Sequence, residues 1–184
     1  MNTLDLYIYN YISTTRSVPL TTFFYIITTI FDFSLSFVLV VLSLIVLIYF
    51  FRGWIYSVFF GLALSGNALL VLVLKYIFNV ARPLDSVAVY FGPSFPSYHS
   101  AIATSFFVLL IYIFKDNFSK NIRGIYIVIC LSFVFLVSVS RIYLGAHWFS
   151  DVVAGVLIGG VATYLSIKIF QRVINRPRIT SMIK

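Results

Sequence analysis

Five long apolar runs take up most of this chain, and they constrain its fold more than any other feature. Crossing the hydrocarbon core of a bilayer, roughly 30 Å thick, takes about 20 predominantly apolar residues in a helix. Only 10% of the residues are charged, against about 25% in ordinary soluble domains. The sequence therefore predicts an all-α fold, a polytopic membrane helical bundle with five clear transmembrane helices. The runs extend from about Phe33 to Phe51, Trp54 to Phe78, His99 to Phe114, Ile122 to Ser140 and Trp148 to Phe170.

Val18 to Phe31 is a sixth candidate span near the N-terminus. Its threonines and the following Asp32 make it only moderately apolar, so we expect it either to tilt through the membrane or to lie along the interface. Before it, Leu4, Ile8, Tyr11 and Ile12 fall on one helical face, which suits an interfacial segment.

The chain shows no soluble domain, linker or internal repeat, and we expect a single integral-membrane domain over residues 1–184. Its parts are an N-terminal interfacial or first-span segment (1–31), a core (32–170) and a basic cytoplasmic tail (171–184).

Basic residues are unevenly distributed around the runs, which indicates how the chain is oriented. With five crossings after Asp32, one side of the membrane holds nine of them: Arg52, Lys115, Lys120, Arg123, Lys168, Arg172, Arg176, Arg178 and Lys184. If Val18 to Phe31 does not cross, the other side holds Arg16, Lys75, Arg82 and Arg141. Because cytoplasmic segments retain Lys and Arg, the loop that contains SFPSYHS (Ser94–Ser100) is expected outside the cytoplasm. We expect the tail charges to meet anionic lipid headgroups, not nucleic acid.

Three cations are predicted at or near the ends of the runs on this outer side. Lys75 and Arg82 are seven residues apart, a spacing that would put them on one face of a continuous helix. A lysine at membrane depth costs about 2.5–3.5 kcal/mol, so Lys75 should face the bundle interior unless it snorkels to the headgroups. Together with Arg141, these side chains can bind one anionic group.

His147 and Asp151 are four residues apart, so a helix would place them on one face. A carboxylate one turn beyond an imidazole can accept its ring N–H, fix the tautomer and stabilise the imidazolium. The other ring nitrogen is then a competent nucleophile or base. Pairs of this kind are also common on helix surfaces. By itself the pair is therefore weak evidence for a catalytic site, and it supports one only together with the other polar segments.

His99, the second of only two histidines in the chain, follows Pro96 and Ser97 at the start of an apolar run. Backbone N–H groups at a helix N-terminus favour an anion, and Ser97 adds a hydroxyl that can also cap the helix. A lone structural histidine is the alternative for His99. Both histidines, however, are predicted near loops on the same side of the membrane.

Together these groups predict a phosphoryl-transfer site. Cations and backbone donors stabilise the charge on the equatorial oxygens of a transferring phosphoryl group. One histidine can attack phosphorus while the other protonates the leaving oxygen, and the residues alone do not decide which does which. Two histidines and one carboxylate beside three cations make a poor cation site. We therefore expect no metal and no other cofactor.

Three segments resemble the signature motifs of one enzyme family. KYIFNVARP, PSYHS and SRIYLGAHWFSD are similar to the Lys-x6-Arg-Pro, Pro-Ser-Gly-His and Ser-Arg-x5-His-x3-Asp motifs of the type 2 phosphatidic acid phosphatase superfamily. The resemblance covers the chain from about Asp32 to Phe170, including the order and spacing of the runs. The apolar composition resembles the membrane lipid phosphate phosphatase branch of that superfamily.

The resemblance implies a role for each matching residue. His147 would be the nucleophile that forms a phosphohistidine, Asp151 its orienting partner and His99 the general acid for the leaving group. The phosphate-binding residues would be Lys75, Arg82, Ser97, Tyr98 and Arg141. Tyr98 departs from the motif, which has glycine there. It keeps the backbone N–H but adds a Cβ and a ring, which a helical or extended backbone would accommodate.

The chain is therefore interpreted as an enzyme, a phosphoric monoester hydrolase or diphosphatase acting on membrane lipids. The expected location is a bacterial inner or plasma membrane, with the site facing the periplasm or cell exterior. Candidate substrates are undecaprenyl diphosphate, phosphatidylglycerophosphate, phosphatidic acid and a lipid A phosphate. Two alternatives remain open: a phosphotransferase that moves a phosphoryl or phospho-headgroup between lipids, and a phospholipid transporter, which would need neither histidine.

Overall fold

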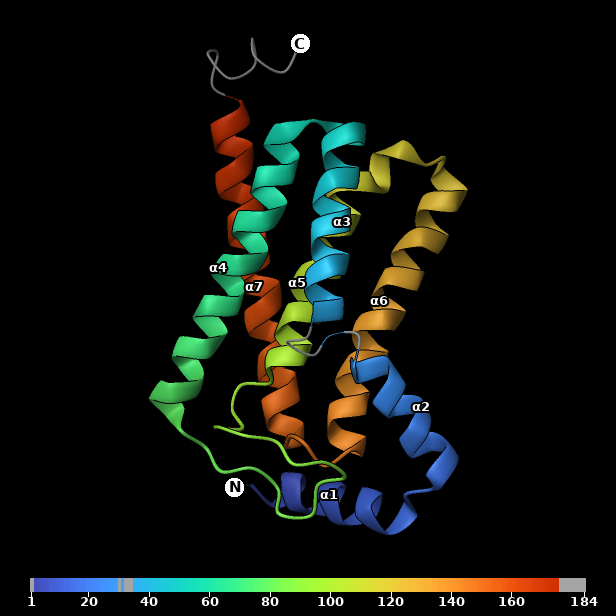
Figure 1. Ribbon diagram of the computed structural model, residues 1–184, viewed down its shortest axis with the longest axis vertical. Coiled ribbons are helices and arrows are strands. Elements are labelled where there is room, and N and C mark those ends of the chain that lie inside the picture. Colours follow the sequence, from blue (N-terminus) through green and yellow to red (C-terminus); the bar gives the residue numbers. More distant parts are fainter. Residues whose placement is uncertain (1, 30, 32–34, 176–184) are drawn as a thin grey trace.

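The computed structural model describes residues 2–29, 31 and 35–175, and every regular element in these ranges is helical. The elements are α1 (Thr3–Thr15), α2 (Val18–Thr29), α3 (Leu35–Arg52), α4 (Trp54–Phe78), α5 (Tyr98–Phe114), the 3₁₀ turn η1 (Lys115–Asn117), α6 (Lys120–Tyr143) and α7 (Phe149–Ile174). Among the described residues, α4, α5 with η1, α6 and α7 are long and apolar enough to cross a membrane. The predicted polytopic helical bundle is confirmed (Figure 1). The predicted start of the first run at Phe33 and the tail beyond Asn175 lie outside the described residues.

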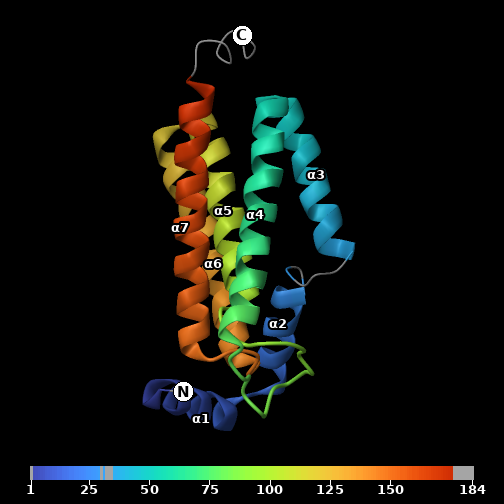
Figure 2. The same cartoon turned by 90° about the vertical axis from the view of Figure 1, so that its left-hand side faces the viewer.

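The helices α2 and α3 follow one another along the bundle and point in the same direction (Figures 1 and 2). α2 starts at the end where α1 lies and packs against α6, whereas α3 packs against α4 and runs on to the opposite end. With 12 residues, α2 is about 18 Å long, too short to cross a bilayer by itself. The candidate span Val18 to Phe31 therefore adds no full crossing of its own.

The short helix α1 lies across one end of the bundle (Figures 1 and 2). Leu4 and Tyr11, from its predicted apolar face, are exposed, whereas Asp5 is buried against α7. Two connections reach the same end of the bundle: residues 79–97 between α4 and α5, and residues 144–148 between α6 and α7. They contain three of the eight predicted site residues, Arg82, Ser97 and His147, and the other five lie on the adjoining helix ends, within four residues of these connections.

The central helix is α5, which packs against α4, α6 and α7. Its contact with α7 is close because α7 presents glycines there: a Cβ at Gly155 would lie 2.5 Å from the carbonyl oxygen of Ser97, and one at Gly159 would overlap the backbone of Ala101. Small residues of this kind let membrane helices approach closely. The packing fixes the start of α5 against the start of α7.

Candidate active site

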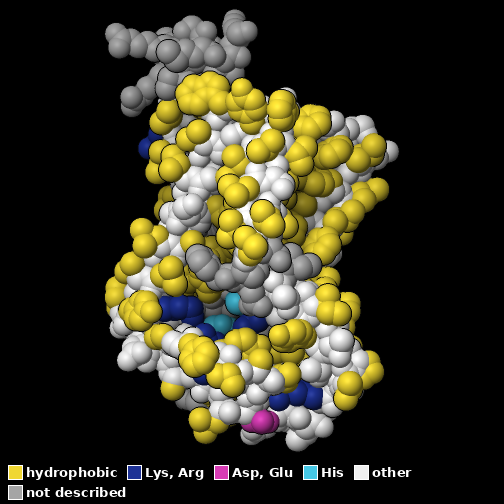
Figure 3. Space-filling view, in the orientation of Figure 1, with side chains coloured by type: hydrophobic (Ala, Val, Ile, Leu, Met, Phe, Trp, Pro, Cys, Tyr) yellow, Lys and Arg dark blue, Asp and Glu magenta, His cyan; other side chains and the backbone are white. Residues whose placement is uncertain are grey.

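Histidine, lysine and arginine side chains gather in a hollow on one side of the bundle, near the end that carries α1 (Figure 3). Hydrophobic side chains lie on both sides of the hollow and below it in this view. The contacts below show that it is built where the two loops meet the ends of α4 and α6 and the starts of α5 and α7.

Lys75 lies in the last turn of α4, and its ammonium group points into the loop between α4 and α5. The Nζ atom donates hydrogen bonds to the carbonyl oxygens of Pro93 (2.7 Å) and Ser94 (3.0 Å). Lys75 is only 7% exposed. Its side chain therefore faces the interior and does not snorkel.

Arg82 lies in the loop, not on a continuation of α4. The helix ends at Phe78 because Asn79 adopts a left-handed conformation, with φ 45° and ψ 44°. The prediction that Lys75 and Arg82 share a helix face is therefore wrong. They come together because both side chains donate to the carbonyl oxygen of Pro93, at 2.7 Å from Lys75 Nζ and 3.3 Å from Arg82 Nη2.

Arg82 also reaches the loop between α6 and α7. Its Nη1 donates to the carbonyl oxygen of Ala146 (2.7 Å) and lies 3.3 Å from Nε2 of His147. Burial lowers the pKa of Arg82, and the neighbouring Arg141 lowers it further. Because the ordinary arginine pKa is so high, the guanidinium remains charged at neutral pH. The structure thus holds a cation directly beside one ring nitrogen of His147.

Arg141, the third cation, lies in the last turn of α6 and is 1% exposed. Its Nη1 donates to the hydroxyl of Thr28 on α2 at 2.5 Å. Its guanidinium carbon lies 4.8 Å from the ring centroid of Tyr90, and that of Arg82 lies 5.6 Å from the same ring. The negative face of an aromatic ring attracts cations, so Tyr90 helps to hold two mutually repelling arginines together.

His147 and Asp151 meet at the start of α7, where Nδ1 and Oδ2 are 3.5 Å apart. The prediction that the two residues share a helix face is wrong, because α7 begins at Phe149 and His147 precedes it. The contact forms because Oδ2 of Asp151 also accepts the backbone N–H of Trp148 (2.9 Å), which turns the carboxylate back over the helix start. As a result, Nδ1 of the imidazole faces the carboxylate and Nε2 faces Arg82.

The electrostatic surroundings of His147 keep its imidazole neutral. Burial lowers its pKa well below the ordinary histidine value, and nearby positive groups lower it further. In decreasing order of effect, these groups are Arg141, Arg82, Lys75 and His99. A neutral imidazole whose Nδ1 faces a carboxylate has its lone pair on Nε2, the form needed for nucleophilic attack.

Ser97, Tyr98 and His99 lie where α5 begins. Ser97 occupies the N-cap position but makes no side-chain capping bond; its hydroxyl oxygen accepts a hydrogen bond from Ser100 at 3.0 Å. Its backbone N–H donates to the carbonyl oxygen of Asp151 at 2.9 Å, which joins this helix start to that of α7. Tyr98 and His99 belong to the first turn, where backbone N–H groups point out of the helix. Such an end can receive an anion.

Tyr98, in the position of the motif glycine, has an ordinary helical backbone. Within the described ranges, Asn79 is the one non-glycine residue with a positive φ, so the dihedral angles at Tyr98 do not require glycine. Its half-buried ring packs against the hydrophobic core and is nearly perpendicular (83°) to the ring of His99, with 6.1 Å between the ring centroids.

Three further residues, Ser94, Thr28 and Tyr90, contact the site but were not predicted from the sequence. Ser94 is fully buried, and its hydroxyl donates to Oδ2 of Asp151; its place within SFPSYHS was the only signal. Thr28 and Tyr90 approach the arginines from α2 and from the long loop. Neither belongs to a recognisable motif, so only the fold brings them to the site.

The helix α1 is tied to three parts of the site end. The carboxylate of Asp5 accepts hydrogen bonds from the backbone N–H (2.9 Å) and the hydroxyl (2.8 Å) of Ser150 at the start of α7. Arg16, just after α1, donates from Nε to the carbonyl oxygen of Tyr143 and from Nη1 to that of Asp85, both at 3.0 Å. These bonds link α1 to α6, α7 and the long loop.

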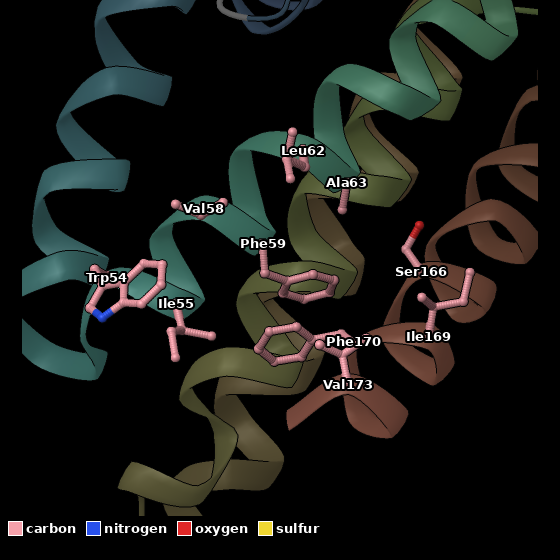
Figure 4. A pocket seen from close by; sticks show the side chains of 10 residues that line it. All are labelled: Trp54, Ile55, Val58, Phe59, Leu62, Ala63, Ser166, Ile169, Phe170 and Val173. Carbon is pink, nitrogen blue, oxygen red and sulfur yellow. The ribbon is translucent and has the colours of Figure 1, made fainter. Parts of the chain in front are cut away.

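The chain also carries an apolar groove between α4 and α7, with a volume of about 490 Å³ (Figure 4). Phe59 and Phe170 stack at its floor, 4.0 Å apart between ring centroids. None of its lining residues belongs to the polar cluster. Among the described residues, no group of three or more His, Cys, Asp or Glu side chains could hold a metal ion.

Comparison with known proteins finds a family model and two solved structures that are similar to this chain. The model of the PAP2 superfamily matches residues 54–175. The crystal structure of a transmembrane PAP2-type phosphatidylglycerolphosphate phosphatase from Bacillus subtilis is 27% identical, covers 94% of this chain and 87% of its own, and has a TM-score of 0.83. LpxE from Aquifex aeolicus is 25% identical, covers 91% of this chain and 96% of its own, and has a TM-score of 0.72. No curated protein sequence matches this chain.

Proposed function

This chain belongs to the PAP2 superfamily, and from that premise we propose that it hydrolyses a phosphate or diphosphate group of a membrane lipid through a phosphohistidine at His147, without a metal. The observation that carries the proposal is the setting of one imidazole: Nδ1 faces Asp151, and Nε2 lies 3.3 Å from the guanidinium of Arg82. A phosphoryl group bound by Arg82 would lie next to Nε2.

In the first step, the lone pair of Nε2 attacks phosphorus, and the bond between phosphorus and the lipid oxygen breaks. The leaving oxygen takes a proton from the imidazolium of His99. Lys75, Arg82 and Arg141 stabilise the charge on the phosphoryl oxygens as it passes between the two atoms. The phosphorylated ring keeps its Nδ1 proton, and Asp151 stabilises the positive charge that the ring acquires.

In the second step, the neutral imidazole of His99 takes a proton from water, and the water oxygen attacks phosphorus. The phosphorus–nitrogen bond breaks, its electron pair returns to Nε2, and inorganic phosphate leaves. His147 is neutral again and His99 is protonated, so the cycle consumes one lipid phosphate and one water.

We propose that the substrate headgroup enters from the outer leaflet of a bacterial inner or plasma membrane while its tails stay in the bilayer. The hollow that contains the histidines opens on the side of the bundle among hydrophobic side chains (Figure 3), which suits a lipid more than a free solute. Phosphatidylglycerophosphate is the first substrate to test because of the Bacillus subtilis structure. Phosphatidic acid, undecaprenyl diphosphate and a lipid A phosphate follow.

The test is phosphate release by the detergent-purified protein, with excess chelator, on each of these four lipids. We expect release from at least one lipid, unchanged by the chelator and reduced by at least about 10³-fold in His147→Ala, because loss of a catalytic nucleophile removes most of the rate enhancement. Release that needs a metal, or that survives in His147→Ala, would contradict the proposal. Labelled phosphate that appears on a second lipid instead of in water would identify a phosphotransferase.

A further inference from the structure

Ser94 is held in place by its backbone, independently of its side chain. Its backbone N–H donates to the carbonyl oxygen of Val80 at 2.7 Å. Its own carbonyl oxygen accepts the ammonium of Lys75 at 3.0 Å. The residue is completely buried. These two bonds fix the backbone of Ser94, and with it the direction of the Cα–Cβ bond, without any contribution from Oγ.

The hydroxyl of Ser94 lies between the two side chains that define the reactive histidine. It donates a hydrogen bond to Oδ2 of Asp151, and its oxygen lies 3.4 Å from Nδ1 of His147. The same Oδ2 atom accepts the N–H of Trp148 at 2.9 Å and lies 3.5 Å from Nδ1. A hydroxyl can donate and accept at once, so Ser94 can accept a hydrogen bond from the Nδ1–H group of His147 while it donates one to the carboxylate.

We propose that Ser94 is a positioning residue for His147, acting with Asp151 to hold the proton on Nδ1 and to leave the lone pair on Nε2. Both contacts of Nδ1 are long for a hydrogen bond, at 3.5 Å to Oδ2 of Asp151 and 3.4 Å to Oγ of Ser94, so the carboxylate and the hydroxyl serve together as acceptors for this one N–H. This role rests on the proposed function in one respect, the identity of His147 as the nucleophile.

A purely structural role for the hydroxyl, filling space in a buried loop, makes a different prediction. Because the backbone bonds of Ser94 hold the loop, Ser94→Ala should leave the fold intact, and under a structural role the tautomer of His147 would not change. Ser138 offers a matched control: it is also buried, in α6, and its hydroxyl has no hydrogen-bond partner among the described residues.

The test measures the tautomer directly, by ¹⁵N NMR of protein labelled on histidine. The chain contains two histidines, so the spectrum contains two imidazoles, and His99→Asn assigns the signals of His147. We expect the Nδ1–H form in the unmodified protein and in Ser138→Ala, and a mixture of both tautomers in Ser94→Ala. In kinetic assays, Ser94→Ala should lower kcat by about 10- to 100-fold, as loss of an outer partner of a functional histidine does, with a smaller change in KM.

Three results would overturn the proposal. Ser94→Ala could retain both the tautomer and kcat. It could lose kcat with the tautomer unchanged, which would indicate a structural role. If Ser94→Ala does not fold, the size-matched Ser94→Cys replaces it, because its thiol is only a weak donor and acceptor. In that case a pure Nδ1–H form in Ser94→Cys is the third result that would overturn the proposal. The NMR result does not depend on turnover, so a failure to hydrolyse any lipid would refute the proposed function and leave this inference to be decided by the spectra.

Discussion

At the scale of single residues, some groups in the site destabilise a positive charge on the imidazole of His147 and others stabilise it. Burial lowers the pKa of His147 most, and Arg141, Arg82 and Lys75 lower it further. The carboxylate of Asp151 supports positive charge on the ring once phosphorus is attached. The neutral ring is thus favoured before attack and the charged ring after it.

The depressed pKa of His147 predicts how stability depends on pH. The folded protein keeps this ring neutral below the ordinary histidine pKa of about 6.5, whereas the unfolded chain takes up a proton there. The contribution of His147 to the free energy of unfolding is therefore complete above about pH 6.5 and is lost as the pH falls toward its folded pKa, by up to about 1.4 kcal/mol per pH unit.

Thermal unfolding of the unmodified protein and of His147→Ala between pH 5 and 8 checks this expectation. The melting temperature of the unmodified protein should fall more steeply on the acid side, because the variant lacks the titrating group. Parallel curves for the two proteins would show that the pKa of His147 is not lowered by folding.

Much of the site could be predicted from residue spacing, but not always for the right reason. The motif residues Lys75, Arg82 and His147 do converge. Lys75 and Arg82 do so through a loop that begins at Asn79, because one left-handed residue ends a helix that the spacing would have continued. Ser94 and Thr28 could not be assigned, since their partners are 57 and 113 residues away in the chain.

At the scale of elements, the contact between α5 and α7 determines how the site residues at the start of α5 lie relative to those at the start of α7. Gly159 lies against the backbone of Ala101, whereas Gly160, its neighbour, has its nearest contact at 3.9 Å, with the side chain of Thr104. The same contact places the start of α5, with Ser97 and His99, beside Asp151 at the start of α7.

Substitutions at these two glycines give a matched pair. Gly159→Ala should force α5 and α7 apart, destabilise the protein by about 1–3 kcal/mol, as overpacking does, and reduce phosphate release. Gly160→Ala, where the added methyl meets only ordinary contacts, should change neither quantity appreciably. Thermal unfolding and lipid phosphatase assays of both variants decide the matter; equal effects would mean that close helix contact at Gly159 is not what positions the site.

The extents of the long helices followed from the apolar runs: Trp54 to Phe78 matches α4 at both ends, and the last three runs agree with α5, α6 and α7 within four residues. The relation between α2 and α3 did not follow, because hydropathy measures the length of an apolar run but not the direction in which two successive helices point.

At the scale of the whole molecule, the polar site and α1 occupy one end of the bundle, and the C-terminal end of α7 occupies the other (Figures 1 and 2). Together α2 and α3 run from the site end to the opposite end, and α4, α5, α6 and α7 then alternate in direction. The chain therefore passes an odd number of times between α1 and the C-terminal end of α7, which puts these two ends on opposite sides of the membrane. The basic residues near the C-terminal end favour a cytoplasmic location for that end.

Topology reporters fused before α1 and after Lys184 test this arrangement. The N-terminal fusion should report the outer side of the membrane and the C-terminal fusion the cytoplasm. A reporter after Gly53, in the turn between α3 and α4, should agree with the C-terminal one. Both ends on one side would contradict the joint passage of α2 and α3 and would reopen a sixth crossing.

Trapping the phosphorylated intermediate shows whether His147 carries the phosphoryl group. The protein is mixed with a lipid labelled in its phosphate, quenched in alkali within the first turnover, digested and analysed by mass spectrometry. We expect a phosphorylated peptide that contains His147, with an acid-labile and alkali-stable modification, and no such peptide from His147→Ala. A label on another residue, or turnover by His147→Ala at the unmodified rate, would contradict it.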